Sequence, residues 1–330
     1  MSELSITVAC NDYDRVRPLA DGRVPIEGCD VNFIALGPEE VFFRAFGGSE
    51  FDVSELSLSS YLMSVARGDG NYVAIPAFVS RMFRHSAIYT RTDRGIEVPE
   101  DLRGREVGVP EYQVTAALWV RGLLCDEYGV GPSEIGWRTG GVEEAGRREK
   151  LALELPSEID VRSISKDKAL GPMLAAGEID ALVAPRAPRC FVDAEPGVGR
   201  LFTDYRAAER DYFAKTGLFP IMHVIGVRRA LLERHPWLAS SVYKAFQKAK
   251  EIAVAELANS TALHATLPWL TAELEQTRSL MGEDYWPYGA EENRATLQAL
   301  TRYSFEQGLT PRPLEIEELF ASSTLDRFKI

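Results

Sequence analysis

Short apolar runs alternate with amphipathic segments over the first two thirds of the chain. Each run has the length of a buried strand. The runs lie at residues 6–9, 31–35, 105–109, 160–164 and 180–184. Amphipathic segments with helical spacing lie at residues 38–46, 110–128 and 167–176. This order of strand, helix and strand predicts an α/β protein with parallel strand pairing.

The last third has a different pattern. Pro236 suits the first position of a helix, and the apolar residues from Leu238 to Leu257 then form one stripe at helical spacing. Later residues also look helical, with an interruption at 282–289. Trp286 and Tyr288 lie in this interruption, where they either pack in the core or line a pocket. We therefore expect a helical C-terminal region.

Two apolar strand sequences carry groups that titrate or bear charge. Residues 72–91 begin and end as strand sequence but contain Arg81, Arg84 and His85, and residues 219–227 contain His223. Because an unpaired buried charge is costly, such groups are expected to face a partner. We interpret the two segments as crossings between two lobes, which would bring His85 and His223 into one cleft.

One lobe inserted into another explains this order. The first lobe is predicted at residues 1–88 and 224–330, and the second at residues 89–223. The two crossings would form a two-strand hinge, and hinge closure around a small molecule suits this architecture. A chain of 330 residues is long enough for two lobes that each have a core.

The composition narrows the classes of partner. The chain is 45% hydrophobic and 26% charged, as in a globular protein, and has a net charge of −12. An acidic protein is not expected to bind nucleic acid, because binding of the phosphates needs a basic surface. No apolar run reaches the roughly 20 residues that span a bilayer, so we expect no membrane association. Homo-oligomerisation is left open.

The N-terminus and the cysteines bear on localisation. The first residues lead directly into strand sequence, with no basic and apolar leader, so we expect a cytoplasmic protein. The four cysteines are widely spaced and form no CxxC motif, which favours reduced, mostly structural thiols.

Several stretches resemble known sequences. The stretches DLRGREVGVP, LAAGEIDALVAP and IGVRRALLERHPWLASSVYKAF resemble landmarks of the type II periplasmic-binding-protein fold. Within that superfamily, the chain is similar to the 4,5-dihydroxyphthalate decarboxylase family through NDYDRVRPLADGRVPIEGCD, FDVSELSLSSYL, SRMFRHSAIYT, GVPEYQVTAALWVRGLLCDEYGV, GLFPIMHVIGVR and WPYGAEENRATLQALTRYSFEQGLTPRPL. The resemblance covers most of the chain. It departs from the family at Asn11, where an aromatic residue is expected.

The resemblance implies a fold and a reaction. The fold would be two-lobed α/β, with two mixed sheets flanked by helices. The reaction would be cofactor-independent decarboxylation of an aromatic dicarboxylic acid in aromatic catabolism, with 4,5-dihydroxyphthalate giving 3,4-dihydroxybenzoate and CO2. The alternatives are a non-catalytic solute-binding protein for a small carboxylate and another small-molecule enzyme on this fold.

Such a reaction needs an acid near the ring carbon that loses CO2, a base for a phenol, and cations for the retained carboxylate. His85 and His223 are the candidate acid and base, in an order that the sequence leaves open. Cations for the carboxylate are expected from Arg81 and Arg84, with Arg186 contributing from the second lobe. Asp14 and Arg15 are further substrate-binding candidates in the loop after the first strand.

Hydrogen-bonding groups are predicted at two helix starts. Tyr112, Gln113 and Thr115 offer donors to an anion. Glu55, Ser57 and Ser59 would hold the catechol hydroxyls, although Glu55 could instead pair with an arginine.

No metal or organic cofactor is expected. The sequence has no HExxH, GxGxxG or Walker motif and no lysine context that suggests a Schiff base. A metal held by His85, His223 and Glu55 is the less favoured alternative.

Overall fold

The structure is a computed structural model that describes residues 3–325. The ends of the predicted first lobe, residues 1–2 and 326–330, lie outside this range. Contacts divide the chain into two compact units. The first comprises the described part of residues 1–81, 221–298 and 314–330, and the second comprises residues 82–220 and 299–313.

The second unit includes a C-terminal segment that the sequence analysis assigned to the first lobe. Residues 299–313 join it because their side chains find partners there. Arg302 forms an ion pair with Asp126, and the Tyr303 hydroxyl donates to the same carboxylate at 2.6 Å. The Gln307 amide donates to the Leu118 carbonyl at 3.0 Å.

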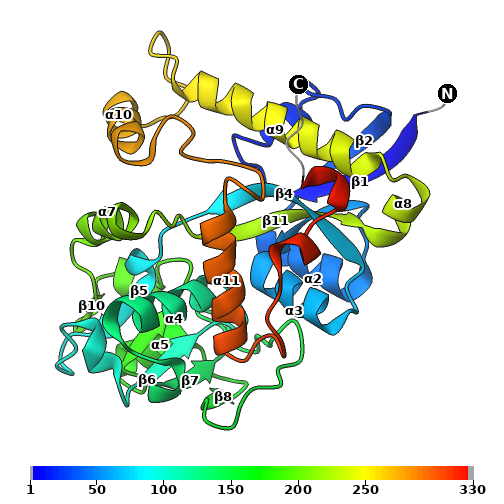
Figure 1. Cartoon of the computed structure of the whole chain (residues 1–330). Helices are drawn as coiled ribbons and strands as arrows, with labels where there is room; N and C mark the ends of the chain where they lie inside the picture. Colours follow the sequence, from blue (N-terminus) through cyan, green and yellow to red (C-terminus); the bar gives the residue numbers. More distant parts are fainter. Residues whose placement is uncertain (1–2, 326–330) are drawn as a thin grey trace. The chain divides into compact units, whose positions relative to one another are not determined.

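The first unit is built on a five-stranded mixed sheet with the order β2-β1-β3-β11-β4. Its strands are β1 (Leu4–Cys10), β2 (Cys29–Ala35), β3 (Val53–Ser57), β4 (Tyr72–Arg81) and β11 (Ile221–Arg228). Strands β2, β1 and β3 are parallel, whereas β11 runs antiparallel to both β3 and β4. Figure 1 shows β11 beside β4 in this sheet. A segment from late in the sequence therefore completes a sheet begun by the N-terminal strands.

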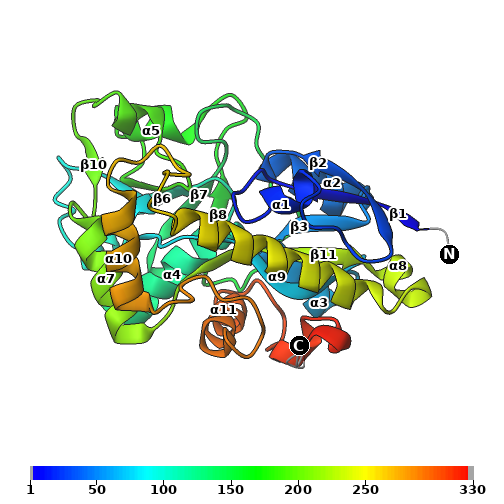
Figure 2. The same cartoon turned by 90° about the horizontal axis from the view of Figure 1, so that it is seen from above.

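Helices of the first unit cover this sheet. They are α1 (Arg17–Ala20), α2 (Pro38–Gly48), α3 (Leu58–Arg67), α8 (Arg229–Arg234) and α9 (Leu238–Leu257). Helix α10 (Leu270–Met281) also belongs to this unit, but none of its residues is buried. Helix α9 buries the stripe that its sequence predicted, including Leu238, Val242 and Phe246. It contacts α1 and β4, and Figure 2 shows it lying along α1. Helix α11 (Arg294–Glu306) begins in the first unit and ends in the second.

The second unit has a six-stranded mixed sheet with the order β10-β5-β9-β6-β7-β8. Its strands are β5 (Ile88–Arg91), β6 (Glu106–Val109), β7 (Gly136–Thr139), β8 (Val161–Ser163), β9 (Ala181–Val183) and β10 (Val198–Arg200). Its helices are α4 (Thr115–Tyr128), α5 (Leu170–Ala176), α6 (Arg189–Val192) and α7 (Tyr205–Thr216). Leu170, Leu174 and Leu182 are fully buried in its core. The chain thus has the predicted mixed α/β architecture, with two sheets flanked by helices.

The segment around His85 differs from the prediction. His85 opens a short 3-10 turn, His85–Ala87, rather than lying on a strand. The Ala87 amide closes this turn by donating to the Arg84 carbonyl at 3.1 Å. Strand β4 ends before it and β5 begins after it, so the apolar character of residues 86–90 reflects burial as much as strand pairing. No helix among residues 3–325 is long and apolar enough to cross a membrane.

Candidate functional site

His223 and Glu55 form a buried pair in the first unit. His223 lies opposite Ser57 and Ile225 lies opposite Glu55 where β11 pairs with β3, so His223 and Glu55 are diagonal neighbours across the two strands. The Nδ1 atom of His223 lies 2.6 Å from Oε1 of Glu55. On its other side, β11 pairs with β4 through register shifts before and after His223. Such irregularities re-aim a side chain.

Glu55 has no exposed surface and receives four donors. Besides His223, these are the Tyr13 hydroxyl at 2.8 Å, the Asn11 amide at 2.9 Å and the Cys10 thiol at 3.4 Å. Burial alone would raise the pKa of Glu55. The hydrogen bond and charge of His223, with the Asn11 and Tyr13 donors, outweigh burial and hold this pKa below its ordinary value. The carboxylate is therefore ionised, and it orients the imidazole through Nδ1.

The imidazole of His223 keeps one nitrogen for other partners. Its side chain is 17% exposed, whereas that of Glu55 is fully buried. Phe42, on α2, packs edge-on against the ring at 4.8 Å between centroids. Because Nδ1 faces Glu55, Nε2 is the atom left to exchange a proton with a ligand. Glu55 is predicted as a ligand for catechol hydroxyls, and in the structure both of its oxygens accept hydrogen bonds from protein donors.

The loop after β1 carries Tyr13 and Arg15, and it brings Tyr13 to the pair of His223 and Glu55. The Tyr13 carbonyl accepts hydrogen bonds from the amides of Val16 and Arg17, which fixes the loop at the start of α1. The Tyr13 hydroxyl then reaches Glu55. Burial and the charge of Glu55 raise the pKa of Tyr13, so the phenol stays protonated and donates.

Arg15 is held between two aromatic rings. Its guanidinium carbon lies 4.3 Å from the ring centroid of Tyr13 and 4.3 Å from that of Trp286. Its Nε donates to the Val79 carbonyl at 2.7 Å, and its Nη1 donates to Asp14 at 2.9 Å. Its Nη2 has no hydrogen-bond partner within the part of the chain that the structure describes. Arg15 therefore presents a planar donor in a fixed orientation, whereas the predicted ligand-binding residue Asp14 serves as its ion-pair partner.

Arg81 does not have the environment predicted for a carboxylate clamp. It is 6% exposed, and its Nη2 donates to the Pro287 carbonyl at 2.7 Å and to the Asn293 side chain. Burial lowers its pKa to about 9. The charge that interrupts this apolar strand finds its partners in the loop after α10, so Arg81 anchors the segment that carries Trp286.

His85 lies in the second unit, in an aromatic cluster. Its ring contacts Phe202 and Tyr212, with centroids 5.0 and 5.3 Å away. It is 2% exposed, and its buried Nδ1 has no hydrogen-bond partner among the described residues. Burial lowers the pKa of His85 to about 4, so the ring is neutral near neutral pH. In its neutral form the ring has no imidazolium proton to deliver.

Arg84 precedes His85 and is also buried. Its Nη1 contacts the sulfur of Met82 at 3.5 Å. Burial lowers the pKa of Arg84 to about 10, while the charge of Glu209 on α7 counters this. Glu209 also accepts the Ser86 amide at 3.2 Å. The charge of Glu209 thus acts on Arg84 within the protein, and contact of this guanidinium with a ligand stays a prediction.

The donors predicted at the start of α4 are bonded to protein. The Glu149 carboxylate accepts the Tyr112 amide at 2.5 Å and the Gln113 side-chain amide at 2.9 Å. The Tyr112 side chain and Thr115 are buried. Lys150, next to Glu149, pairs with the buried Glu111 at 2.5 Å and so anchors this loop. In this structure, an internal carboxylate occupies the place where the sequence predicted a substrate anion.

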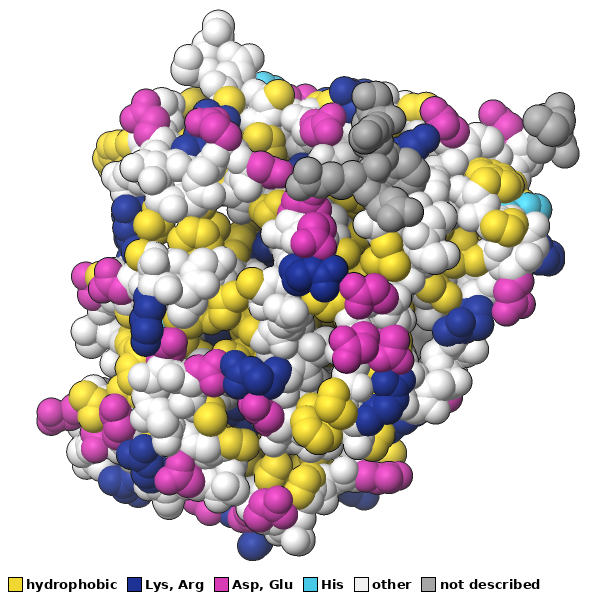
Figure 3. All heavy atoms as spheres, in the orientation of Figure 1, with side chains coloured by type: hydrophobic (Ala, Val, Ile, Leu, Met, Phe, Trp, Pro, Cys, Tyr) yellow, Lys and Arg dark blue, Asp and Glu magenta, His cyan; other side chains and the backbone are white. Residues whose placement is uncertain are grey.

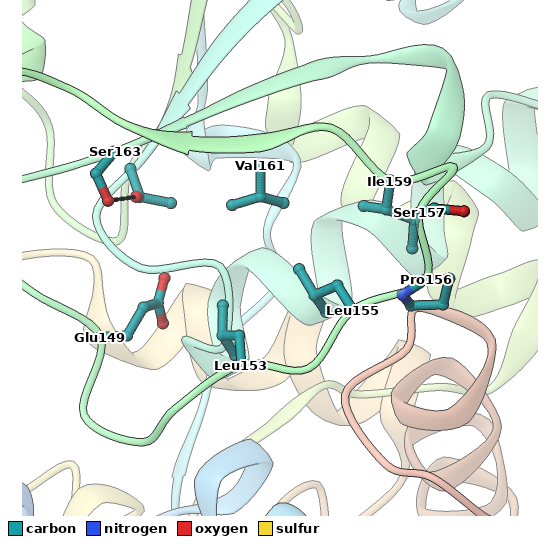
Figure 4. A pocket seen from close by; sticks show the side chains of 9 residues that line it. Glu149, Leu153, Leu155, Pro156, Ser157, Ile159, Val161 and Ser163 are labelled. Atoms are coloured by element: carbon teal, nitrogen blue, oxygen red, sulfur yellow. Dashed lines mark hydrogen bonds between the residues drawn. The ribbon is translucent and has the colours of Figure 1, made fainter.

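Glu149 also lines a cavity of about 390 Å³ in the second unit. Figure 4 shows Glu149 and Leu153 on one side of this cavity and Val161 and Ser163 on the other. The Ser163 hydroxyl is hydrogen-bonded to that of Thr139 at 3.2 Å. Burial raises the pKa of Glu149. Because the cavity contains a carboxylate and no basic lining residue, it is not the predicted anion site.

The remaining predicted residues are divided between the two units. Ser57 and Ser59 are buried, at the end of β3 and in the first turn of α3. Arg186 is exposed just after β9. No group of three or more His, Cys, Asp or Glu side chains in residues 3–325 is arranged to hold a metal ion. Basic and acidic side chains are interspersed on the face drawn in Figure 3.

Comparison with solved structures defines the class of fold. The chain is similar to the periplasmic aliphatic sulphonate binding protein SsuA of Escherichia coli, with a TM-score of 0.53, 14% identity, and coverage of 98% of this chain and 99% of that one. It is also similar to the periplasmic sulfonate-binding protein SsuA of Methylobacillus flagellatus KT, with a TM-score of 0.51, 12% identity, and coverage of 98% and 94%. The fold is therefore that of the periplasmic binding proteins, as predicted.

Sequence comparison defines the family. No family model matches the chain. The chain is 45% identical to the 4,5-dihydroxyphthalate decarboxylase of Comamonas testosteroni over 330 residues, which is the whole of both chains. It is 47% identical to the enzyme of the same name from Pseudomonas putida over 213 residues, which is 64% of this chain and 83% of that one. The chain belongs to the 4,5-dihydroxyphthalate decarboxylase family.

Proposed function

We propose that this protein decarboxylates 4,5-dihydroxyphthalate to 3,4-dihydroxybenzoate and CO2. The observation that carries the proposal is the 45% identity to the Comamonas testosteroni enzyme over the full length of both chains. The pair formed by His223 and Glu55 supports it, because a carboxylate-oriented imidazole is a suitable proton donor.

The chemistry sets what the residues must do. Direct loss of CO2 would leave an aryl carbanion of high energy. The accessible route adds a proton to the ring carbon that bears the departing carboxylate, with electron donation from the hydroxyl para to that carbon. The bond between the ring carbon and the carboxyl carbon then breaks and CO2 leaves. The electron pair of that bond returns to the ring, which restores aromaticity. The proton gained by the carbon replaces the carboxyl group, and the phenolic proton is returned.

His223 is the proposed acid. Glu55 holds the imidazole through Nδ1, and Nε2 would deliver the proton to the ring carbon. General acid catalysis of this kind contributes about 10²–10⁴-fold. His85, which is neutral near neutral pH, is the proposed base for the phenol.

Arg15 is the proposed receptor for the retained carboxylate. Its planar guanidinium is fixed by Tyr13, Trp286 and the Val79 carbonyl, and its Nη2 faces no protein acceptor among residues 3–325. A guanidinium that is already oriented loses less entropy when it binds a carboxylate than a free one. Arg186 and the hydroxyls of Ser57 and Ser59 remain predicted contacts.

Two further aspects belong to the proposal. We place the reaction in the cytoplasm, where free thiols such as those of the four cysteines stay reduced. The substrate is a small aromatic acid bound without nucleic acid or membrane, and self-association remains a prediction.

The test is incubation of the purified protein with 4,5-dihydroxyphthalate. We expect release of CO2 and equimolar formation of 3,4-dihydroxybenzoate, measured by chromatography. Binding of the diacid without turnover, measured by calorimetry, would instead identify a solute-binding protein. If the protein neither binds nor converts the diacid, the assignment of this substrate is refuted.

A further inference from the structure

Tyr13 stands between the proposed acid and the proposed carboxylate receptor. Its hydroxyl lies 2.8 Å from Oε1 of Glu55, and this oxygen also lies 2.6 Å from Nδ1 of His223. The face of its ring covers the guanidinium of Arg15 at 4.3 Å. The Tyr13 side chain thus contacts Glu55, the partner of His223, through its hydroxyl, and contacts Arg15 through its ring.

The hydroxyl completes the environment of a buried carboxylate. Glu55 is fully buried, so each of its lone pairs depends on a protein donor. The Tyr13 hydroxyl shares Oε1 with His223, whereas the Asn11 amide and the Cys10 thiol bond to Oε2. Without the hydroxyl, Oε1 would keep only the imidazole, and the ionised form of Glu55 would be less favoured.

The ring acts on a different group. Arg15 is stacked between Tyr13 and Trp286, and its Nε and Nη1 are bonded to the Val79 carbonyl and to Asp14. With these contacts made, Nη2 has no hydrogen-bond partner among residues 3–325. If the Tyr13 ring were absent, one face of the guanidinium would be uncovered and its plane would be free to tilt.

We propose that Tyr13 is a positioning residue that aligns both halves of this site, its hydroxyl acting on the Glu55–His223 pair and its ring acting on Arg15. The inference rests on the proposed function, since it assigns the two halves to proton transfer and to carboxylate binding. It predicts that the two effects can be separated by substitution.

The first variant removes the hydroxyl alone. Tyr13→Phe keeps the ring over Arg15, so KM for 4,5-dihydroxyphthalate stays within about twofold of the wild-type value. Loss of a hydrogen bond to a charged group lowers kcat by about 10- to 100-fold. Because Glu55 loses a donor, it protonates more easily, and the acidic limb of the pH profile of kcat/KM moves up by about one pH unit.

The second variant removes the ring as well. Tyr13→Leu repeats the loss in kcat and also raises KM by about tenfold, since Arg15 loses one stacking face. The matched control is Tyr72→Phe, because the Tyr72 hydroxyl donates to the Phe51 carbonyl at 2.8 Å in the same unit. This control loses stability but keeps the wild-type kcat, KM and pH profile.

The proposal is overturned if Tyr13→Phe retains both the wild-type kcat and its acidic limb, or if the two variants have the same KM. Should Tyr13→Phe fail to fold by circular dichroism, 3-fluorotyrosine at position 13 keeps the ring and strengthens the donor. The acidic limb should then move to lower pH, and an unmoved limb refutes the role of the hydroxyl.

A wild-type protein that releases no CO2 refutes the proposed function but leaves Tyr13 testable. The chain has four histidines, so 15N spectra of the imidazoles resolve the His223 signal with the aid of a His223→Asn variant. We expect the pH at which this signal responds to protonation of Glu55 to be higher in Tyr13→Phe than in the wild type. An unchanged midpoint overturns the inference about the hydroxyl independently of activity.

Discussion

Glu55→Gln is the substitution that probes the His223 pair most severely. Glutamine has nearly the same shape, but its amide has one acceptor oxygen and one donor nitrogen, whereas the carboxylate receives four donors. At least one donor among Asn11, Tyr13 and His223 must then face the new NH2 group. The imidazole loses both its charge partner and the acceptor that fixes its Nδ1 proton.

The magnitude follows from the burial of the pair. Removing one partner of a buried ion pair costs about 3–5 kcal/mol, and the isosteric amide places the expected loss near the lower end, about 3 kcal/mol. The effect on catalysis is larger than that of a lost contact, because the imidazole also loses the carboxylate that fixes its orientation. We expect kcat to fall by about 10²–10⁴-fold.

The loss in stability should depend on pH. The pKa of Glu55 in the folded protein lies below its ordinary value, so its stabilising contribution is complete above the ordinary value of about 4.3. The contribution is lost as pH falls below that value through the folded pKa. The difference in unfolding free energy between wild type and Glu55→Gln should therefore shrink as the solution is acidified below about pH 4.3.

The assays are urea unfolding at several pH values and steady-state kinetics with 4,5-dihydroxyphthalate. Asp52→Asn is the matched control, because Asp52 pairs with Arg228 beside the same two strands. This control should lose stability and keep kcat. Glu55→Gln with wild-type kcat, or with a stability difference that does not change on acidification, would refute the argument that Glu55 is an ionised positioning group.

Other substitutions test the remaining assignments. His223→Ala and His85→Ala should each lower turnover at least tenfold while circular dichroism shows a folded protein, and unchanged kcat in both would remove the acid–base assignment. Arg15→Met should raise KM for the diacid by about 10- to 100-fold. Arg17→Met is the control for this variant, because Arg17 forms an exposed ion pair with Asp12. Equal KM values in Arg15→Met and Arg17→Met would contradict the role of Arg15. Arg81→Met should lower the unfolding free energy by about 1–3 kcal/mol, because it leaves buried acceptors unbonded, with KM within about twofold. Unchanged stability with a tenfold higher KM would restore Arg81 as a substrate ligand.

Local patterns predicted the elements of this fold well. Apolar runs marked β1, β2, β6, β8, β9 and β11, and the stripe from Leu238 to Leu257 marked α9, because these signals depend only on burial with a fixed period. His223 was located on a strand for the same reason. His85 was misplaced, since a 3-10 turn packed among aromatic rings has the same apolar composition as a strand.

These local patterns did not predict which residues contact each other when they lie far apart in the sequence. Glu55 and His223 are separated by 168 positions, and Arg81 meets Pro287 across 206 positions. A charged residue in an apolar run signals that a partner exists, but not whether that partner is protein or ligand. For Arg81 the partner is a protein loop, and for the amides at the start of α4 it is Glu149.

Tyr13 and Trp286 were not predicted as a pair for a different reason. They lie in loops without periodicity, and their contact with Arg15 depends on how two distant loops meet. The only signal was compositional: aromatic residues lie in the WPYG segment and beside Arg15 at Tyr13. Aromatic residues and an arginine suggest a stacking contact, but the sequence alone does not give the geometry of that contact.

Decarboxylation in D2O tests the central claim most directly. We expect the purified protein to convert 4,5-dihydroxyphthalate to CO2 and 3,4-dihydroxybenzoate. NMR and mass spectrometry should show one carbon-bound deuterium in this product, at the ring position ortho to the remaining carboxylate. Recovery of unchanged diacid would contradict the proposed function, and a product without that deuterium would contradict protonation at the ring carbon.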